Sequence, residues 1–141
     1  MRAGCKRCDD ERGALNAEQD GESAKDGRYL KVRTKQFALE IIRLYASLPK
    51  KTEALVLGKQ FLRSGTSVGA HYREAQRARS NAESISKFEG GMQELEETLY
   101  WLELLEESGI AVGDRVSILQ KEANELMAIM VASVKTAKRI S

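Results

Sequence analysis

The amino-acid sequence predicts an all-α protein, an antiparallel up-down-up-down four-helix bundle preceded by a disordered N-terminal leader. Of its 141 residues, 42% are hydrophobic and 31% charged, a composition typical of one ordinary globular domain. It contains one Pro, one Trp, three Phe and four Tyr, whereas β-sandwiches and barrels need aromatic residues in strands and Pro in turns. From residue 31 onward, apolar residues recur every three or four positions, which is the spacing of amphipathic helices.

The predicted leader, residues 1–28, contains six basic and seven acidic residues and almost no large apolar ones. Such a segment cannot bury enough apolar surface to offset the entropy lost on ordering, so we predict that the bundle domain spans residues 29–141. Cys5 and Cys8 form an isolated C-x-x-C pair without two further zinc ligands nearby, and we interpret them as reduced thiols. Their role stays open, as does a true start downstream of Met1.

The first two predicted helices are separated by Pro49. A wide apolar face marks the helix that begins near Lys31, and Pro49 ends it. This face consists of Phe37, Ile41, Leu44, Tyr45 and Leu48. Thr52 is a suitable N-cap for the next helix, which extends to about residue 78. Its core stripe consists of Leu57, Phe61, Ser64, Val68, Tyr72 and Ala75.

The last two predicted helices have clear start signals. Ser80 and Glu83 form a capping box ahead of the third helix, and Gly109 ends it. Its apolar stripe consists of Ile85, Phe88, Met92, Leu95, Leu99 and Leu102. Asp114 is a suitable N-cap for the fourth helix, whose stripe consists of Val116, Leu119, Ala123, Leu126, Met130, Val134 and Ala137. Because the connections are short, neighbouring helices should run in opposite directions.

Three glycines interrupt the second predicted helix, although each costs about 1 kcal/mol relative to Ala in a helix interior. Gly58, Gly65 and Gly69 lie within about 40° of one another on a helical wheel, so another helix can approach closely there. We assign them to an oligomer interface. A break of the helix at Ser64–Ser67 is the alternative. Gly90–Gly91 in the third helix indicates either a kink or a further close contact.

The net charge of +2 conceals an uneven distribution of charge along the chain. Residues 31–79 contain eleven Lys and Arg against three Glu, which gives a net charge of +8. Residues 80–114 contain one Lys against nine acidic residues and carry −8, and residues 115–141 carry +3. The first two helices are therefore basic, and the third is acidic.

The basic residues of the second helix form a ridge on the side opposite its apolar stripe. This ridge consists of Lys59, Arg63, Arg73 and Arg77, and it is preceded by Lys35, Arg43, Lys50 and Lys51. We predict that these eight residues bind the phosphate backbone of a nucleic acid. The alternatives are a solvated face and ion pairs between the ridge and the acidic third helix of the same or a neighbouring chain. Because no aromatic residue lies on the ridge, base stacking is not expected.

Large apolar side chains also occur away from the predicted core. Trp101 and Leu105 lie about 120° or more from the centre of the stripe on the third helix, and Ile118 and Ile129 show the same misfit on the fourth. Such groups mark protein contacts, so we predict self-association through Trp101, Leu105 and the glycine edge. A basic face that meets an acidic face of another copy is a heterologous contact, which closes into a ring.

No catalytic or cofactor-binding pattern appears in the sequence. The only histidine, His71, does not supply the paired Glu-x-x-His motifs of di-iron bundles, and we interpret it as a structural residue. Glu94, Glu96 and Glu97 are interpreted as a solvated helix face. We therefore expect that the protein is not an enzyme and holds no metal or other cofactor. No apolar run is long enough to cross a membrane and no signal peptide is recognisable, so we expect a cytoplasmic location.

The second predicted helix contains the string LRSGTSVGAHYREA at residues 62–75, with Gln60 and Leu48-Pro49 before it. A Ser-x-Phe-Glu context at Phe88 and an Glu-Leu-Glu-Glu-Thr run at residues 94–98 follow in order. Over about residues 33–138 the chain thus resembles the four-helix-bundle family of proteins encoded in intervening sequences of bacterial 23S ribosomal RNA genes. The family usually has Asn where this chain has His71 and Gly where it has Ala75.

The resemblance implies a four-helix bundle without enzymatic activity. Members of the family are similar to the accessory variability determinant protein of diversity-generating retroelements, a pentameric barrel with a basic surface that binds RNA and its reverse transcriptase. Together with the basic segment, this leads to the hypothesis of a homopentamer that binds structured RNA or a DNA backbone, as an accessory subunit of a ribonucleoprotein or a reverse transcriptase. The alternative is an oligomeric scaffold or regulatory subunit that binds only protein partners.

Overall fold

The computed structural model describes the backbone of residues 22–140 and the side chains of residues 29–140. The chain divides into two compact units, Met1–Val32 and Arg33–Ser141, and all contacts discussed from here on lie within the second unit. Most of the predicted leader, including both cysteines, lies outside the described residues.

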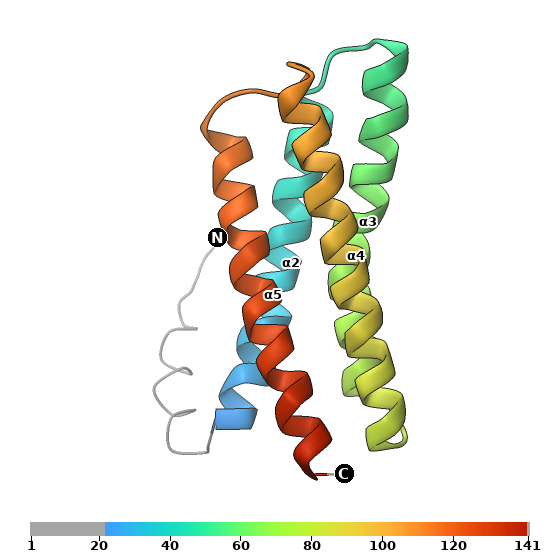
Figure 1. Ribbon diagram of the computed structural model, residues 1–141, viewed down its shortest axis with the longest axis vertical. Coiled ribbons are helices and arrows are strands. Elements are labelled where there is room, and N and C mark those ends of the chain that lie inside the picture. The colour runs from blue at the N-terminus through green and yellow to red at the C-terminus, as the bar shows by residue number, and fades with distance from the viewer. Residues whose placement is uncertain (1–21, 141) are drawn as a thin grey trace, which may run out of the picture. The chain divides into compact units, whose positions relative to one another are not determined.

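Four α-helices make up the described part of the chain, and none of its residues is in a strand (Figure 1). They are α2 (Glu22–Ala46), α3 (Thr52–Gln76), α4 (Asn81–Glu107) and α5 (Asp114–Ile140). The predicted all-α class with four helices is therefore confirmed. The start of α2 at Glu22 precedes the predicted start at Lys31, because extending an existing helix into a polar segment costs far less than nucleating a new one.

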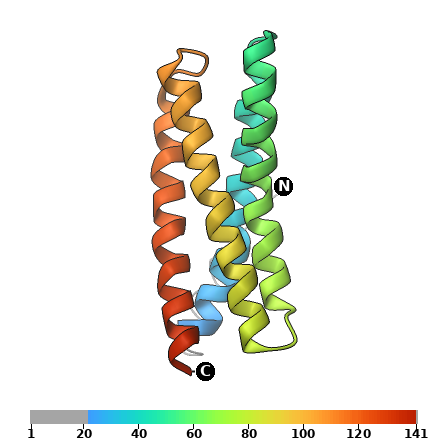
Figure 2. The same ribbon diagram turned by 45° about the vertical axis from the view of Figure 1, so that its right-hand side comes forward.

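Contacts between successive helices pair residues in opposite order. Along α3, a Cβ at Gly58 would meet Tyr45 of α2, whereas a Cβ at the later Gly65 would meet the earlier Ile41. The same reversal relates α3 to α4, where Ser64 meets Thr98 and Glu74 meets Lys87. It also relates α4 to α5, where Glu89 meets Lys138 and Glu106 meets Gln120. Figures 1 and 2 show the same course, since each connection lies at the opposite end from the one before.

The helix ends agree with the sequence signals at two of four sites. Ser80 is the N-cap of α4, and its hydroxyl accepts a hydrogen bond from the Glu83 backbone N–H at 3.0 Å, as predicted. Gly109 follows the end of α4 with a φ of +80°, a left-handed conformation that favours glycine. Thr52 is wrongly predicted as a cap, because Lys51 has the extended backbone of the N-cap of α3. Asp114 is likewise the first residue of α5 rather than its cap.

The core lies between the four helices, and on α4 it follows a different line from the predicted one. The buried residues of α4 are Gly91, Leu95, Thr98, Leu102 and Leu105. Leu105 is 0% exposed, so its predicted outward position and its assignment to an oligomer interface are wrong. The reason is that the buried line passes through Gly91 and Thr98, which a stripe of large apolar residues leaves out.

The three glycines of α3 face α2 of the same chain. A Cβ at Gly65 would lie 2.7 Å from Cγ1 of Ile41, and a Cβ at Gly58 would lie 3.0 Å from Leu48. A Cβ at Gly69 would lie 3.2 Å from the Thr34 hydroxyl. The predicted close approach of another helix is therefore present, but its assignment to an oligomer interface is corrected to a contact within one chain.

The alternative of a broken helix at Ser64–Ser67 is excluded, because α3 is continuous through this segment. The hydroxyls of Thr66 and Ser67 bond back to backbone carbonyls one turn earlier, at 2.8 Å and 2.7 Å. Ser64 is fully buried, and its Oγ is hydrogen-bonded to Oγ1 of Thr98 at 2.9 Å. This pair links the centres of α3 and α4, so a polar contact fixes the register of the two helices.

Candidate nucleic-acid interface

The predicted basic ridge is only partly available to a ligand. Lys59, Arg73 and Arg77 are exposed. None of the three makes an ion pair within residues 29–140. On the opposite side of the same helix, Phe61 and Val68 are 0% exposed, so core packing directs the three cations into solvent.

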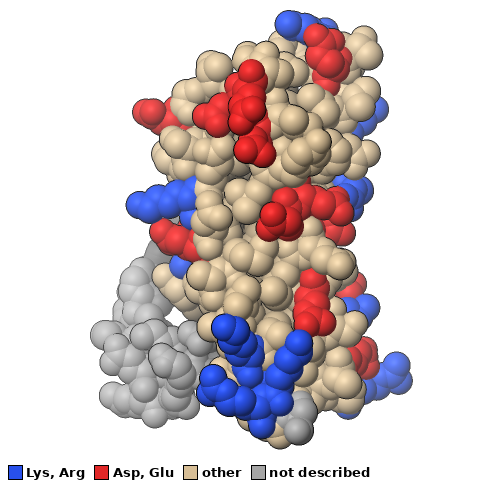
Figure 3. All heavy atoms as spheres, in the orientation of Figure 1, with Lys and Arg blue, Asp and Glu red and all other residues tan. Residues whose placement is uncertain are grey.

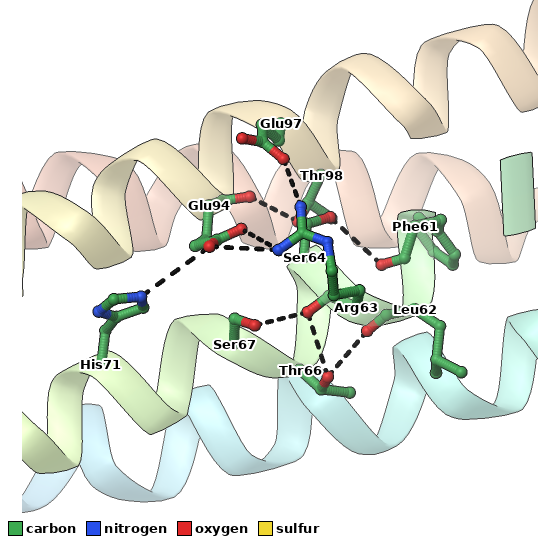
Figure 4. Close-up of polar contacts among 10 residues, drawn as sticks. All are labelled: Phe61, Leu62, Arg63, Ser64, Thr66, Ser67, His71, Glu94, Glu97 and Thr98. Carbon is green, nitrogen blue, oxygen red and sulfur yellow. Dashed lines mark hydrogen bonds and ion pairs between the residues drawn. The ribbon is translucent and has the colours of Figure 1, made fainter. Parts of the chain in front are cut away.

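Arg63, the fourth residue of the ridge, is bound by the acidic helix of its own chain. Its Nη1 lies 3.1 Å and 3.3 Å from the two carboxylate oxygens of Glu94, and its Nη2 lies 2.6 Å from Oε1 of Glu97. Figure 4 shows the guanidinium reaching from α3 to these two carboxylates of α4. The alternative of an ion pair with the acidic helix thus applies to Arg63, so its charge is largely neutralised within the chain.

The cations that precede the ridge are also divided. Arg43 pairs with Glu40 one turn earlier on α2, so its charge is partly neutralised. Lys35, Lys50 and Lys51 are exposed and make no ion pair in the part of the chain that the structure describes.

Neutralisation of Arg63 separates two groups of free cations on and near α3. The first group consists of Lys50, Lys51 and Lys59. The second consists of Arg73 and Arg77, and Lys35 lies nearer to it because its neighbour Thr34 contacts Gly69. At 1.5 Å per residue, Lys59 and Arg73 are about 21 Å apart along the helix axis. The aromatic residues of α3, Phe61 and Tyr72, are both buried, so this surface offers charge and no stacking platform.

His71, in the segment that carries the family resemblance, packs against Gly90–Gly91 of α4. A Cβ at residue 90 would lie 2.9 Å from Cε1 of His71, which accounts for the glycine there by close contact rather than by a kink. Its Nε2 lies 3.9 Å from a carboxylate oxygen of Glu94, and its buried Nδ1 has no hydrogen-bond partner among residues 29–140. The side chain thus fills the space between α3 and α4, as Figure 4 shows beside Glu94.

The acidic face of α4 borders a groove of about 330 Å³ between α4 and α5. Its lining consists of Glu96, Leu99, Tyr100, Glu103, Gln120 and Asn124. Tyr100 is 53% exposed, and its ring centroid lies 5.2 Å from that of the half-buried Trp101. The indole Nε1 of Trp101 is buried and has no hydrogen-bond partner in the described part of the chain. Of the predicted interface residues, Trp101 is therefore the one that reaches the surface of this helix pair.

The individual partners of Arg63 were not predicted, because the sequence offered pairing with the acidic helix only as a general alternative and Glu94 and Glu97 were interpreted as a solvated face. The capping box at Ser80 could have identified these partners, because it fixes where α4 begins. Once α4 starts there and runs antiparallel to α3, residues equally far from the connection face each other, which places Arg63 opposite residues 94–98.

The described residues contain neither a candidate metal site nor a candidate membrane-spanning helix. No group of three or more His, Cys, Asp and Glu side chains among them is placed to hold a metal ion. None of the helices in this part of the chain is long and apolar enough to cross a membrane.

Comparisons with known proteins identify a family and show similarity to a solved structure. A family model described as 23S rRNA-intervening sequence protein matches residues 30–132. A crystal structure of a protein of unknown function from Bacteroides thetaiotaomicron, of the S23 ribosomal protein family, is 34% identical with a TM-score of 0.74. The match covers 78% of this chain and 98% of that one. No curated protein matches.

Proposed function

The chain belongs to the family of 23S rRNA-intervening sequence proteins, and from this premise we propose that it is a non-enzymatic, homo-oligomeric bundle that binds structured RNA. The observation that carries the proposal is the set of exposed cations on α3 without partners among residues 29–140, namely Lys59, Arg73 and Arg77. Rigid, unpaired cations along one helix attract phosphates, because each phosphate contact releases condensed counterions.

The nature of this surface favours recognition of the RNA backbone over its bases. The outer face of α3 offers no aromatic ring for stacking, since Phe61 and Tyr72 are buried. A-form helices are recognised largely by shape and by contacts to phosphates and 2′-hydroxyls. Affinity should therefore depend strongly on salt and weakly on base sequence. A DNA backbone offers the same phosphates and is a competing ligand for this surface.

The RNA-binding proposal is tested with a triple variant, Lys59→Gln, Arg73→Gln and Arg77→Gln. In filter binding to a structured RNA at several salt concentrations, the variant should lose most of its affinity, and its salt slope should fall by about three. The control removes the same charge elsewhere, through Lys87→Gln, Arg115→Gln and Lys121→Gln, and should bind nearly as the wild type does. Equal affinity of both variants and the wild type would contradict the proposal.

The same proposal includes assembly into a pentamer, the number that the resemblance implies. Trp101 and the exposed ring of Tyr100 support a contact on α4, and the carboxylates of Glu96 and Glu103 beside them complement a basic face of another copy. Because apolar burial should drive this contact, Trp101→Ala should lower the mass measured by light scattering, whereas the exposed Val56→Ala should not. A wild-type mass near one chain, or an assembled Trp101→Ala variant, speaks against the assembly.

In the cell, the proposed protein would act as an accessory subunit of a ribonucleoprotein or a reverse transcriptase. The competing function is a scaffold that binds protein partners only. The groove between α4 and α5 favours it, because its carboxylates and its tyrosine suit a basic protein segment. The filter-binding test separates the two functions, since a pure scaffold retains no RNA whatever its charge.

A further inference from the structure

A hydrogen bond joins the start of α4, just after the connection from α3, to the C-terminal end of α5. Nδ2 of Asn81, at the start of α4, donates to the backbone carbonyl of Ala137 at 3.0 Å. About two turns further into α4, Glu89 forms an ion pair with Lys138 at 3.1 Å. These two contacts hold the last turns of α5 beside the first turns of α4, which follow the end of α3 after a short connection.

Cations surround this junction on both sides. Arg77 and Arg79 lie just before Asn81, and Lys135, Lys138 and Arg139 lie around Ala137, all with exposed side chains. Figure 3 shows Lys and Arg side chains gathered at the end of the molecule where α5 ends in Figure 1.

The carboxylates nearby are already occupied. Glu89 is paired with Lys138. An oxygen of Glu83 lies 3.4 Å from the Arg79 backbone N–H, beside the Ser80 cap. Arg77, Arg79, Lys135 and Arg139 have no ion-pair partner in the part of the chain that the structure describes.

Stabilisation of helix ends explains only some of these cations. The negative end of a helix dipole attracts cations in the last turn, which accounts for Lys138 and Arg139 of α5. Lys135 precedes the last turn, and Arg79 lies outside any helix, so the dipole effect does not explain either of them. Four unpaired cations from two segments far apart in the sequence thus converge on one end of the bundle.

We propose that the phosphate-binding surface of α3 continues past Arg77 and Arg79 onto Lys135 and Arg139 of α5, so that the backbone of a structured RNA crosses this end of the bundle. The inference rests on the proposed function and extends it to a second helix. Lys135 and Arg139 lie outside residues 30–132, the part matched by the family model.

The test compares two double variants of the full-length chain with the same charge change on the same helix. Lys135→Gln with Arg139→Gln removes the proposed contacts, and Arg115→Gln with Lys121→Gln removes two cations from the first half of α5. Both are measured by filter binding to a long RNA hairpin across a salt series, after circular dichroism has shown unchanged helix content. The first variant should bind roughly tenfold or more weakly at 0.1 M salt, and its salt slope should fall by about two.

A third variant, Lys59→Gln with Arg73→Gln, separates the inference from the proposed function. If it weakens binding while the Lys135/Arg139 variant binds like the wild type, RNA binding through α3 stands and its extension to α5 is wrong. Equal weakening by the two α5 variants would also overturn the extension, because net charge would then explain the loss. If no variant changes the affinity, both the inference and the proposed function are wrong.

Discussion

Arg63 and Arg73 are exposed arginines of one helix, yet two carboxylates of α4 hold Arg63, whereas Arg73 has no ion-pair partner among residues 29–140. The difference is one of position around α3. Residues on the side of Arg63 face the acidic helix of the same chain, and residues on the side of Arg73 face solvent. The net positive charge of a segment therefore overestimates the number of cations available to a ligand, because carboxylates of the same chain neutralise some of them.

The largest difference between sides of α3 is expected between the side that faces α2 and the side that faces solvent. Gly65→Val should destabilise the protein by about 2–3 kcal/mol, because a side chain there must displace the fully buried Ile41. On the solvent side, Ala70→Val should change the free energy of unfolding by less than about 0.5 kcal/mol. Urea unfolding of both variants measures the contrast, and similar values would mean that the two sides do not differ.

The buried hydroxyl pair between α3 and α4 should give the next largest effect. Thr98→Val leaves Ser64 with only a 3.3 Å hydrogen bond to the Phe61 carbonyl, so we expect a loss of about 1–2 kcal/mol. Adding Ser64→Ala should then cost less than it does alone, because the partner is already absent. Strict additivity in this double-mutant cycle, measured by chemical unfolding, would show that the two hydroxyls are not coupled.

We expect the smallest effects on stability from substitutions of the two arginines, which also test the difference between them directly. Arg63→Gln should cost at most about 1 kcal/mol, since the side chain is 48% exposed and solvent screens its ion pairs. It should leave RNA affinity nearly unchanged, whereas Arg73→Gln should weaken RNA binding and leave stability unchanged. Thermal unfolding and filter binding of both single variants check this, and an equal loss of RNA affinity would remove the distinction.

Most of the fold could be predicted from local signals. Pro49, the Ser80 cap and Gly109 mark helix boundaries through backbone chemistry that each residue carries itself. The buried line of α4 could not be found this way. It passes through Gly91 and Thr98, whose burial depends on Met130 and Ser64 of other helices, and Leu105 was consequently placed on the wrong side.

The positive charge of the candidate site could be predicted from the sequence, but the full set of residues that form it could not. Lys59, Arg73 and Arg77 follow from the phase of the apolar stripe on α3. The pairing of Arg63 and the contact of the start of α4 with the end of α5 depend on which residues of separate helices meet. Single-sequence patterns do not contain that information until the register between the helices is known.

The side chain of His71 on α3 occupies the space that a side chain at position 90 of α4 would need. A Cβ at residue 90 would lie 2.9 Å from the imidazole, so the larger side chain on α3 requires the smallest residue on α4. A chain with a shorter side chain at position 71 has room for alanine at position 90. The energetic effects of substitutions at these two sites should therefore be coupled, because a shorter side chain at position 71 relieves the cost of a Cβ at position 90.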